Sequence, residues 1–319
     1  MTAFAEILTE SPELHAILRT AQVVAATDVN VLILGESGTG KELLARALHQ
    51  SSRRANRPFV ALNCAALPEA LAESLLFGHS RGAFSGATQD HVGQIQAADG
   101  GTLLLDEVGE LSPALQAKLL RFLESGEYHP VGQTSVRCAD VRVLAATHRD
   151  LAAMVREGLF RADLYYRLHV VPLELPALHA RRGDIALLLE HFTAQLSVQH
   201  GLPAPRYSAA AVAQLRAHTW PGNVRELRNF CERMLILCSG RHIEPTNLPP
   251  EIRAQQSDAA TAALPFHFPE QGLQLEALEQ SLIRQALHTA RGNRSRAARL
   301  LGLTRDTLLY RIKKYTIVA

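Results

Sequence analysis

The chain has 319 residues, of which 47% are hydrophobic and 20% charged, and its formal net charge is +2. This length suits about two or three globular domains. No apolar run approaches the roughly 18–20 residues that a membrane span needs, and the acidic start MTAFAEILTE lacks the basic residues of a signal peptide. These features argue against a membrane-spanning or secreted protein and predict a cytoplasmic one.

Short apolar, β-branched runs alternate with helical patterns through residues 1–180. The runs are continuous rather than alternating, which is typical of parallel strands buried on both faces. Helical patterns such as Glu42–His49 and Ser112–Glu124 separate them. A doubly wound α/β domain is therefore predicted over residues 1–180. The expected strands are Val29–Leu34, Phe59–Leu62, Thr102–Leu105, Val141–Ala146 and Val170–Leu175.

After about residue 180 the strand pattern is expected to stop. Amphipathic helices are predicted at Asp184–His200, Ala209–His218 and Val224–Cys238, which gives a small helical subdomain over 181–244. Five prolines then punctuate a stretch rich in Ala, Gln and Asp. This composition predicts a linker over residues 245–272.

The C-terminal segment 273–319 predicts a separate all-helical domain. Helices are expected at Leu275–Thr289, Ser295–Leu301 and Arg305–Tyr315, and Thr304 is a plausible N-cap for the last one. A short glycine-containing turn joins the last two, which is typical of a helix-turn-helix. From residue 291 to the end there are eight Lys or Arg residues and one acidic residue. This charge suggests contact with a polyanion, and a solvated tail is the alternative interpretation that charge alone leaves open.

A glycine-rich loop follows the first predicted strand and opens a helix, as a phosphate-binding loop does. Its glycines let backbone N–H groups face phosphate oxygens, and the helix N-terminus adds a positive dipole. Lys41 would reach the β- and γ-phosphates of ATP. Glu42 stands where the general pattern has Ser or Thr for Mg²⁺. The loop residues are Gly35, Glu36, Ser37, Gly38, Thr39, Gly40, Lys41 and Glu42.

Two carboxylates end a later predicted strand, in the run Leu103-Leu104-Leu105-Asp106-Glu107. The carboxyl end of a parallel strand lies beside the phosphate loop. Asp106 suits Mg²⁺, directly or through water. Glu107 suits the positioning of the attacking water in phosphoryl transfer. The alternative interpretation is a surface Asp-Glu pair at a strand end.

The chain resembles the AAA+ bacterial enhancer-binding proteins of the NtrC type, which activate sigma-54 RNA polymerase. The resemblance covers roughly residues 10–245 and 275–317. It implies an AAA+ parallel-sheet domain with a helical lid and a Fis-type helix-turn-helix. GESGTGKE is the family's own form of the loop, so Glu42 is expected there. The matching segments are GESGTGKE, FVALNCAAL, LFGHSRGAFSGA, GGTLLLDEVGE, FRADLYYRL and WPGNVREL.

The most specific match is the GAFSGA segment, which in the family usually reads GAFTGA and contacts sigma-54. An exposed Phe84 between glycines is costly unless it touches a partner, and Gly82 and Gly86 would let the loop swing. The other interpretation is an ordinary glycine-rich turn with a half-buried Phe84. Ser85 replaces the usual Thr. The expected contact residues are Gly82, Ala83, Phe84, Ser85, Gly86 and Ala87.

The resemblance also implies roles for residues outside these motifs. Asn63 would pair with Glu107 and hold it inactive until sigma-54 is engaged. Thr147 and His148 would sense the γ-phosphate. Arg161 and Arg167 look like arginine fingers that reach the neighbouring subunit's nucleotide, which implies a homo-oligomer, probably a hexamer when active. Arg225 would contact the nucleotide in cis.

The segment 290–315 resembles the family's Fis-type helix-turn-helix. Residues at the start of the second helix usually meet base edges and later basic residues meet phosphates. Double-stranded enhancer DNA is the expected partner. The candidate contact residues are Arg305, Asp306, Thr307, Tyr310, Arg311, Lys313 and Lys314.

Two other functions share part of this pattern. A regulator of the TyrR kind has the fold without sigma-54 activation, but such relatives lack or degrade the GAFSGA loop. A general AAA+ remodeller has no reason to carry both this loop and a Fis-type end. No receiver, GAF or PAS pattern precedes the AAA+ similarity. We therefore expect control by a separate protein acting in trans, or by expression level.

Overall fold

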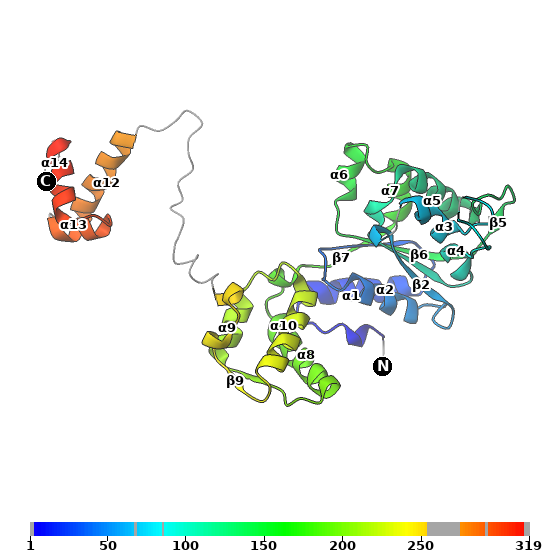
Figure 1. The fold of residues 1–319 in the computed structure, drawn as a ribbon, viewed down its shortest axis with the longest axis horizontal. Coiled ribbons are helices and arrows are strands. Elements are labelled where there is room, and N and C mark those ends of the chain that lie inside the picture. The colour runs from blue at the N-terminus through cyan, green and yellow to red at the C-terminus, as the bar shows by residue number, and fades with distance from the viewer. Residues whose placement is uncertain (1–2, 67–68, 85, 254–274, 291–292, 316–319) are drawn as a thin grey trace. The chain divides into compact units, whose positions relative to one another are not determined.

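A computed structural model describes residues 3–66, 69–84, 86–253, 275–290 and 293–315. The chain forms two compact units, Met1–Gln255 and Gln256–Ala319 (Figure 1). Ser85 and most of the predicted linker, from residue 254 onward, lie outside the described residues.

The first unit is built on a five-stranded parallel sheet with the order β2-β3-β6-β1-β7. Every neighbouring pair is parallel, so the carboxyl ends of all strands meet at one edge. The predicted doubly wound α/β fold is therefore confirmed, with each predicted strand in the sheet. The strands are β1 (Val31–Leu34), β2 (Phe59–Asn63), β3 (Thr102–Asp106), β6 (Arg142–Thr147) and β7 (Val171–Glu174).

Helices cover both faces of this sheet (Figure 1). Leu32 of β1 packs into the cluster on one face, while Val31 and Ile33 pack into the cluster on the other. Each strand therefore needs apolar side chains in both directions, which produces its continuous apolar run. One face carries α1 (Pro12–Ala25) and α2 (Lys41–Gln50); the other carries α3 (Glu69–Phe77), α4 (Gln94–Ala97), α5 (Pro113–Ser125), α6 (Leu151–Arg156) and α7 (Ala162–Leu168).

Shorter elements connect these helices and strands. An antiparallel pair, β4 (Glu127–Tyr128) and β5 (Arg137–Cys138), follows α5. Short 3-10 turns lie at Ala3–Glu6, Cys64–Ala66, Val108–Glu110, Leu178–Ala180 and Pro245–Asn247.

A helical lid follows the sheet, with its own apolar core around Trp220. It contains α8 (Asp184–His200), α9 (Ala209–Ala217) and α10 (Asn223–Leu237), as the sequence predicts. The expectation that strands stop near residue 180 was wrong in one respect. β8 (Arg206–Tyr207) and β9 (His242–Ile243) form a small parallel pair. Strands of two residues are too short to produce a recognisable period in the sequence.

A buried ion pair joins the lid to the rest of the first unit. Nη1 of Arg181 donates to Oδ2 of Asp184 at 3.4 Å, and Nη2 donates to the carbonyl of Thr39 at 3.1 Å. Asp184 also accepts from Thr9 Oγ1 at 2.7 Å and from the backbone N–H of Glu10 at 2.6 Å. Because Asp184 is fully buried, these bonds replace its hydration. One carboxylate thus connects the N-terminal segment with the lid, and its partner Arg181 extends the connection to the phosphate loop.

The second unit is a small helical domain with a core that includes Ile283, Ala297, Leu308 and Ile312. It contains α12 (Leu275–Thr289), α13 (Arg294–Leu300) and α14 (Arg305–Lys314). Thr304 caps α14, because its hydroxyl accepts from the N–H of Thr307. This confirms the predicted helix-turn-helix. No described helix of either unit is long and apolar enough to cross a membrane.

Asp184→Ala should lower the free energy of unfolding of the first unit by about 3–5 kcal/mol, since it leaves the Arg181 guanidinium buried without its counter-ion. Urea denaturation followed by tryptophan fluorescence measures this, because Trp220 lies in the lid core. Asp163→Ala, which breaks an exposed pair with Arg161, is the control and should barely move the midpoint. Equal effects of the two substitutions would contradict the role of the buried pair.

Candidate functional site

The predicted phosphate loop lies between β1 and α2 at the carboxyl edge of the sheet. Gly35, Gly38 and Gly40 have φ values of 147°, 80° and 109°, a region that favours glycine. A Cβ on Gly38 would lie 2.3 Å from the carbonyl oxygen of Gly222 in the lid. Nζ of the buried Lys41 donates to the carbonyl of Gly35 at 2.8 Å. Lys41 therefore lies within the phosphate loop, as its predicted contact with phosphate oxygens requires.

The carboxylates of Asp106 and Glu107 lie beside this lysine, at the end of β3. Oε1 of Glu107 is 3.6 Å from Nζ of Lys41. Burial, aided by the charge of Glu107, raises the pKa of the Asp106 carboxyl above its ordinary value. Burial also acts to raise the pKa of Glu107, but the hydrogen bond from His148 and the charge of Lys41 outweigh it, and that pKa is lowered. Both effects are typical of carboxylates in a functional cluster.

Glu107 is bonded to His148 rather than to Asn63. Nδ1 of His148 lies 2.7 Å from Oε2 of Glu107, and the backbone N–H of His148 donates to the same oxygen at 3.3 Å. The side chain of Asn63 instead accepts from the N–H of Ala65 at 2.9 Å, across the 3-10 turn that follows β2. Among the described contacts Asn63 does not meet Glu107, and this turn leaves Nδ2, the atom of the amide that could donate to a carboxylate, unused.

The ends of β6 and α10 also reach the loop. Thr147 is fully buried, and its hydroxyl accepts from the N–H of Arg149 at 3.1 Å. It shares a cavity of about 380 Å³ with Gly35 and His148. Arg225 donates from Nη1 to Oγ of Ser37 at 3.0 Å, which places it against the loop of its own chain.

Asn223 is a contact that the sequence analysis missed. It is fully buried, with a left-handed φ of 51°. Its Oδ1 accepts from the N–H of Leu178 at 2.7 Å, and its Nδ2 donates to Glu36 Oε2 at 2.9 Å and to the Ser37 carbonyl at 3.1 Å. The only signal available was its place in WPGNVREL, since these partners are far away in the sequence.

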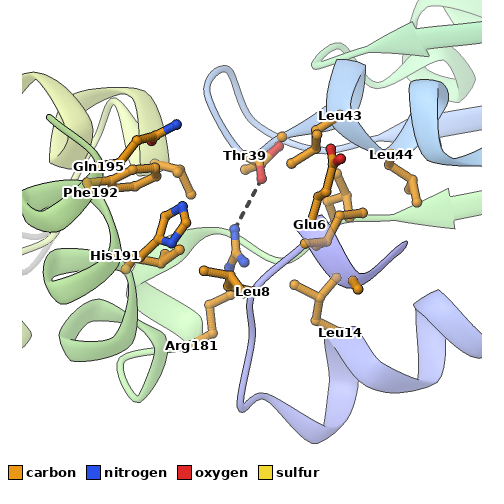
Figure 2. A pocket seen from close by; sticks show the side chains of 16 residues that line it. Glu6, Leu8, Leu14, Thr39, Leu43, Leu44, Arg181, His191, Phe192 and Gln195 are labelled. Carbon is orange, nitrogen blue, oxygen red and sulfur yellow. Dashed lines mark hydrogen bonds between the residues drawn. The ribbon is translucent and has the colours of Figure 1, made fainter. Parts of the chain in front are cut away.

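A largely apolar cavity of about 520 Å³ adjoins the loop, between the N-terminal segment, α2 and α8 (Figure 2). Leu8, Leu14 and Phe192 supply apolar walls, while His191 and Gln195 supply polar groups on the lid side. An apolar pocket with a few polar groups beside a phosphate loop suits the base of a nucleotide. Sequence reasoning missed it, because its lining comes from several segments that are far apart in the sequence.

The two proposed arginine fingers lie on and just before α7 and have local partners. Arg161 forms a bidentate pair with Asp163, at 3.0 and 2.6 Å. Arg167 donates twice to the carbonyl of Leu123, at 3.1 and 2.9 Å. In the contacts of the described residues, neither arginine meets its own phosphate loop.

The GAFSGA segment forms a turn in which the N–H of Gly82 donates to the carbonyl of Ala87 at 2.8 Å. Phe84 is half-buried rather than exposed, as the second interpretation has it. Its ring packs edge-on against the ring of His79, with centroids 5.0 Å apart. His79 is in turn bonded to Oγ of Ser74 at 2.6 Å. The Phe84 ring therefore packs against His79, whose own position is fixed by its hydrogen bond with Ser74.

The candidate DNA-contact residues of α14 divide into two groups. Arg305, Asp306, Tyr310, Lys313 and Lys314 are exposed, whereas Thr307 and Arg311 are half-buried. Thr307, Arg311 and Lys314 also have partners within the unit. Arg311 pairs with Glu279, Lys314 lies 3.5 Å from Glu276, and Thr307 is bonded to Thr304.

Three family matches cover most of the chain. Residues 7–174 match the Sigma-54 interaction domain, and residues 179–265 match the AAA+ ATPase lid domain. Residues 274–315 match the Bacterial regulatory protein, Fis family.

Similar proteins and structures agree with these matches. Regulatory protein AtoC of Escherichia coli (strain K12) is 45% identical over 98% of this chain and 68% of its own length. The alginate biosynthesis transcriptional regulatory protein AlgB of Pseudomonas aeruginosa is 48% identical over 96% of this chain and 66% of its own. The chain thus spans about two thirds of these relatives. The crystal structure of NtrX from Brucella abortus in complex with ATP has a TM-score of 0.72 and 36% identity, covering 97% of this chain and 69% of that one.

Lys41→Ala should weaken ATP binding by about 10- to 100-fold, because it removes a charge-assisted contact to phosphate oxygens. Titration with a fluorescent ATP analogue measures the affinity. Lys118→Ala removes a surface lysine paired with Glu73 and serves as the matched control. An ATP affinity that does not change in Lys41→Ala would contradict the assignment of the loop.

Proposed function

The chain belongs to the family of sigma-54-dependent transcriptional activators, and we propose that its own loop residues bind ATP and drive sigma-54 RNA polymerase into an open promoter complex. It is an AAA+ ATPase with a Fis-type helix-turn-helix. The observation that carries the proposal is the meeting of Lys41, Asp106 and Glu107 at the carboxyl edge of the sheet. A cation and two carboxylates at the end of a phosphate loop are the residues that phosphoryl transfer requires.

In the proposed reaction each of these residues has one task. Lys41, now bonded to the Gly35 carbonyl, would turn its ammonium to the β- and γ-phosphate oxygens of ATP. Glu107 would orient the attacking water and accept its proton. Thr147, at the end of β6, would contact the γ-phosphate and so sense its presence. Arg225 would hold the lid against the loop through its hydrogen bond to Ser37.

We propose that Asp106 binds Mg²⁺. Its raised pKa reflects a carboxylate whose burial and negative neighbour favour a compensating positive charge. Among the described residues, no three His, Cys, Asp or Glu side chains form a metal cage. Phosphate oxygens and water would therefore complete the coordination. The ion would neutralise charge on the phosphates.

The position of the arginines supports an oligomer. Arg161 and Arg167 belong to the α7 region and meet Asp163 and the Leu123 carbonyl rather than their own loop. We propose that they complete the site of the neighbouring subunit, in a ring that is a hexamer when active. The carboxylate of Asp163 would release Arg161 on assembly.

The Gly82–Ala87 turn is the proposed contact with sigma-54. The 3-10 turn Cys64–Ala66 packs against Val108–Glu110, which follows Glu107, and α3 leads from there to the turn. We propose that a change at Glu107 reaches Phe84 along this part of the chain. If the Phe84 ring left its contact with His79, it would be exposed and could contact sigma-54.

The helix-turn-helix is the proposed site for enhancer DNA. Arg305 and Thr307 at the start of α14 would meet base edges, and Lys313 would meet phosphates. Within the chain, we propose an ATPase subdomain at 1–180, a lid at 181–244, a linker at 245–272 and the helix-turn-helix domain at 273–319. Control by a separate protein stays a prediction.

Glu107→Gln should still bind ATP but lower kcat by about 100-fold or more, because the amide cannot accept the proton of the attacking water. Steady-state phosphate release and binding of a fluorescent ATP analogue separate the two effects. Glu124→Gln changes an exposed carboxylate on α5 and is the control. Near-normal turnover in Glu107→Gln would show that a residue other than Glu107 activates the attacking water.

Phe84→Ala should hydrolyse ATP within about twofold of the parent chain yet lower sigma-54-dependent transcription by about 30-fold, as loss of an aromatic anchor does. The control Val198→Ala truncates an exposed apolar residue of the lid. Normal transcription with Phe84→Ala would contradict the proposal that the Gly82–Ala87 turn couples ATP hydrolysis to activation of sigma-54 RNA polymerase. ATPase activity and DNA binding by the parent chain without any activation would instead favour a regulator of the TyrR kind.

A further inference from the structure

We propose that the lid contains a binding site for a small neutral organic molecule, separate from the nucleotide cavity. A cavity of about 440 Å³ lies between α8, the segment that leads into β8, and α9. Its volume is within the range of small-molecule sites, about 300–1,000 Å³. Its aliphatic walls come from Leu189, Pro205 and Val212. The described lining includes none of the residues proposed above to contact ATP, sigma-54 or DNA.

Two buried hydroxyl groups of this lining have no hydrogen-bond partner among the described residues. They are Oγ1 of Thr193, a residue that is only 5% exposed, and the phenol oxygen of Tyr207. A buried hydroxyl without a partner lowers the stability of a fold, so such groups are rare in native proteins. Two of them in the wall of one cavity therefore offer hydrogen bonds to a molecule that enters it.

The buried part of the cavity wall is uncharged. Burial raises the pKa of the Tyr207 phenol above its ordinary value, and the nearby Thr193 hydroxyl only partly opposes this shift. Burial also raises the pKa of the neighbouring Cys231 thiol to about 12, so both groups keep their protons at neutral pH. The charged residues of the lining, Glu190 and Arg206, are exposed. A neutral molecule with an apolar body and one amide or carbonyl group suits these surroundings.

Helix α8 lies between this cavity and the nucleotide cavity beside the phosphate loop. The nucleotide side has His191, Phe192 and Gln195 (Figure 2), and the lid side has Leu189, Glu190 and Thr193. The two sets are offset by two residues, which is about 200° around a helix, so they lie on opposite faces of α8.

A molecule that shifts α8 from the lid side would therefore move a wall of the nucleotide cavity and change the affinity for ATP. This second step rests on the proposed function, in which that cavity belongs to the ATP site. Binding of the small molecule to the lid does not depend on it.

A purely structural role accounts less well for the two hydroxyl groups. Phe and Val have nearly the same shapes as Tyr and Thr and would fill positions 207 and 193 without a buried polar group. A hydroxyl that stabilised the lid would have a partner within it, as the indole of Trp220 has in the carbonyl of Leu215 at 2.8 Å.

Benzamide is the probe for this site, because it is neutral, has one ring, and carries an amide that can both accept and donate hydrogen bonds. Ligand-observed NMR with the full chain should show binding with a Kd of about 1 mM or lower. Benzoate has almost the same shape but a negative charge, and should bind about tenfold more weakly. No binding of benzamide, or binding no tighter than that of benzoate, would overturn the proposal.

Two conservative variants test the hydroxyl groups. Tyr207→Phe and Thr193→Val should each weaken benzamide binding by about three- to tenfold, since each removes one hydrogen-bonding group. The control is Tyr166→Phe, which removes the hydroxyl of an exposed tyrosine on α7 and should bind like the parent chain. Equal benzamide affinity in the parent chain and both lid variants would contradict the assignment of the site.

Urea denaturation without a probe tests whether the hydroxyl groups serve the fold instead. Tyr207→Phe and Thr193→Val should unfold at the midpoint of the parent chain or at a higher one, because each removes a buried hydroxyl without a partner. A clearly lower midpoint in both variants would assign the hydroxyl groups to the stability of the lid and overturn the proposal.

A final pair of titrations tests the effect on the nucleotide. Saturating benzamide should change the affinity for a fluorescent ATP analogue by about fivefold, and the analogue should change the affinity for benzamide by the same factor. Benzamide binding with no change in the affinity for the analogue would overturn the role of α8. If the analogue does not bind the parent chain at all, the proposed function fails, whereas the benzamide titrations still decide whether the lid has a site.

Discussion

The close approach of the phosphate loop to the lid is the constraint on which the rest of the structure depends. The carbonyl of Gly38 accepts from the N–H of Val224 at 3.0 Å, and a Cβ on Gly38 would be 2.3 Å from the Gly222 carbonyl. Asn223 and Arg181 add buried hydrogen bonds between the same parts. Because buried polar groups are costly to leave without partners, loop and lid must adjust together. A nucleotide that reshapes the loop therefore acts directly on the lid.

The parallel sheet makes this arrangement useful for catalysis. All carboxyl ends meet at one edge, so Lys41 after β1, Glu107 after β3 and His148 after β6 come together from distant parts of the chain. The left-handed backbone of Glu107 places its carboxylate between the other two. The 3-10 turns after β2 and β3 pack against each other, and the Gly82–Ala87 turn proposed to meet sigma-54 follows farther along the chain.

Much of this fold could be predicted from sequence, because burial on both faces gives β6 and its neighbours an unbroken apolar run. The phosphate loop was equally visible, since only glycine tolerates its backbone and contacts. The bonds of Asn223, the Arg181–Asp184 pair and the cavity beside the loop were not predictable. The Asn223 bonds, the bonds from Arg181 to Thr39 and from Thr9 to Asp184, and the cavity lining join segments far apart in the chain, and no local pattern marks them. The contact between Asn63 and Glu107 stays a prediction, and the amide oxygen of Asn63 accepts from the N–H of Ala65.

The measurement that tests the central claim most directly is strand opening at a supercoiled sigma-54 promoter, followed by permanganate reactivity, with purified sigma-54 holoenzyme and this chain. The account predicts opening with ATP and none with a non-hydrolysable ATP analogue or without the chain. Opening that is independent of hydrolysis, or ATP hydrolysis and enhancer binding with no opening at all, would contradict the account.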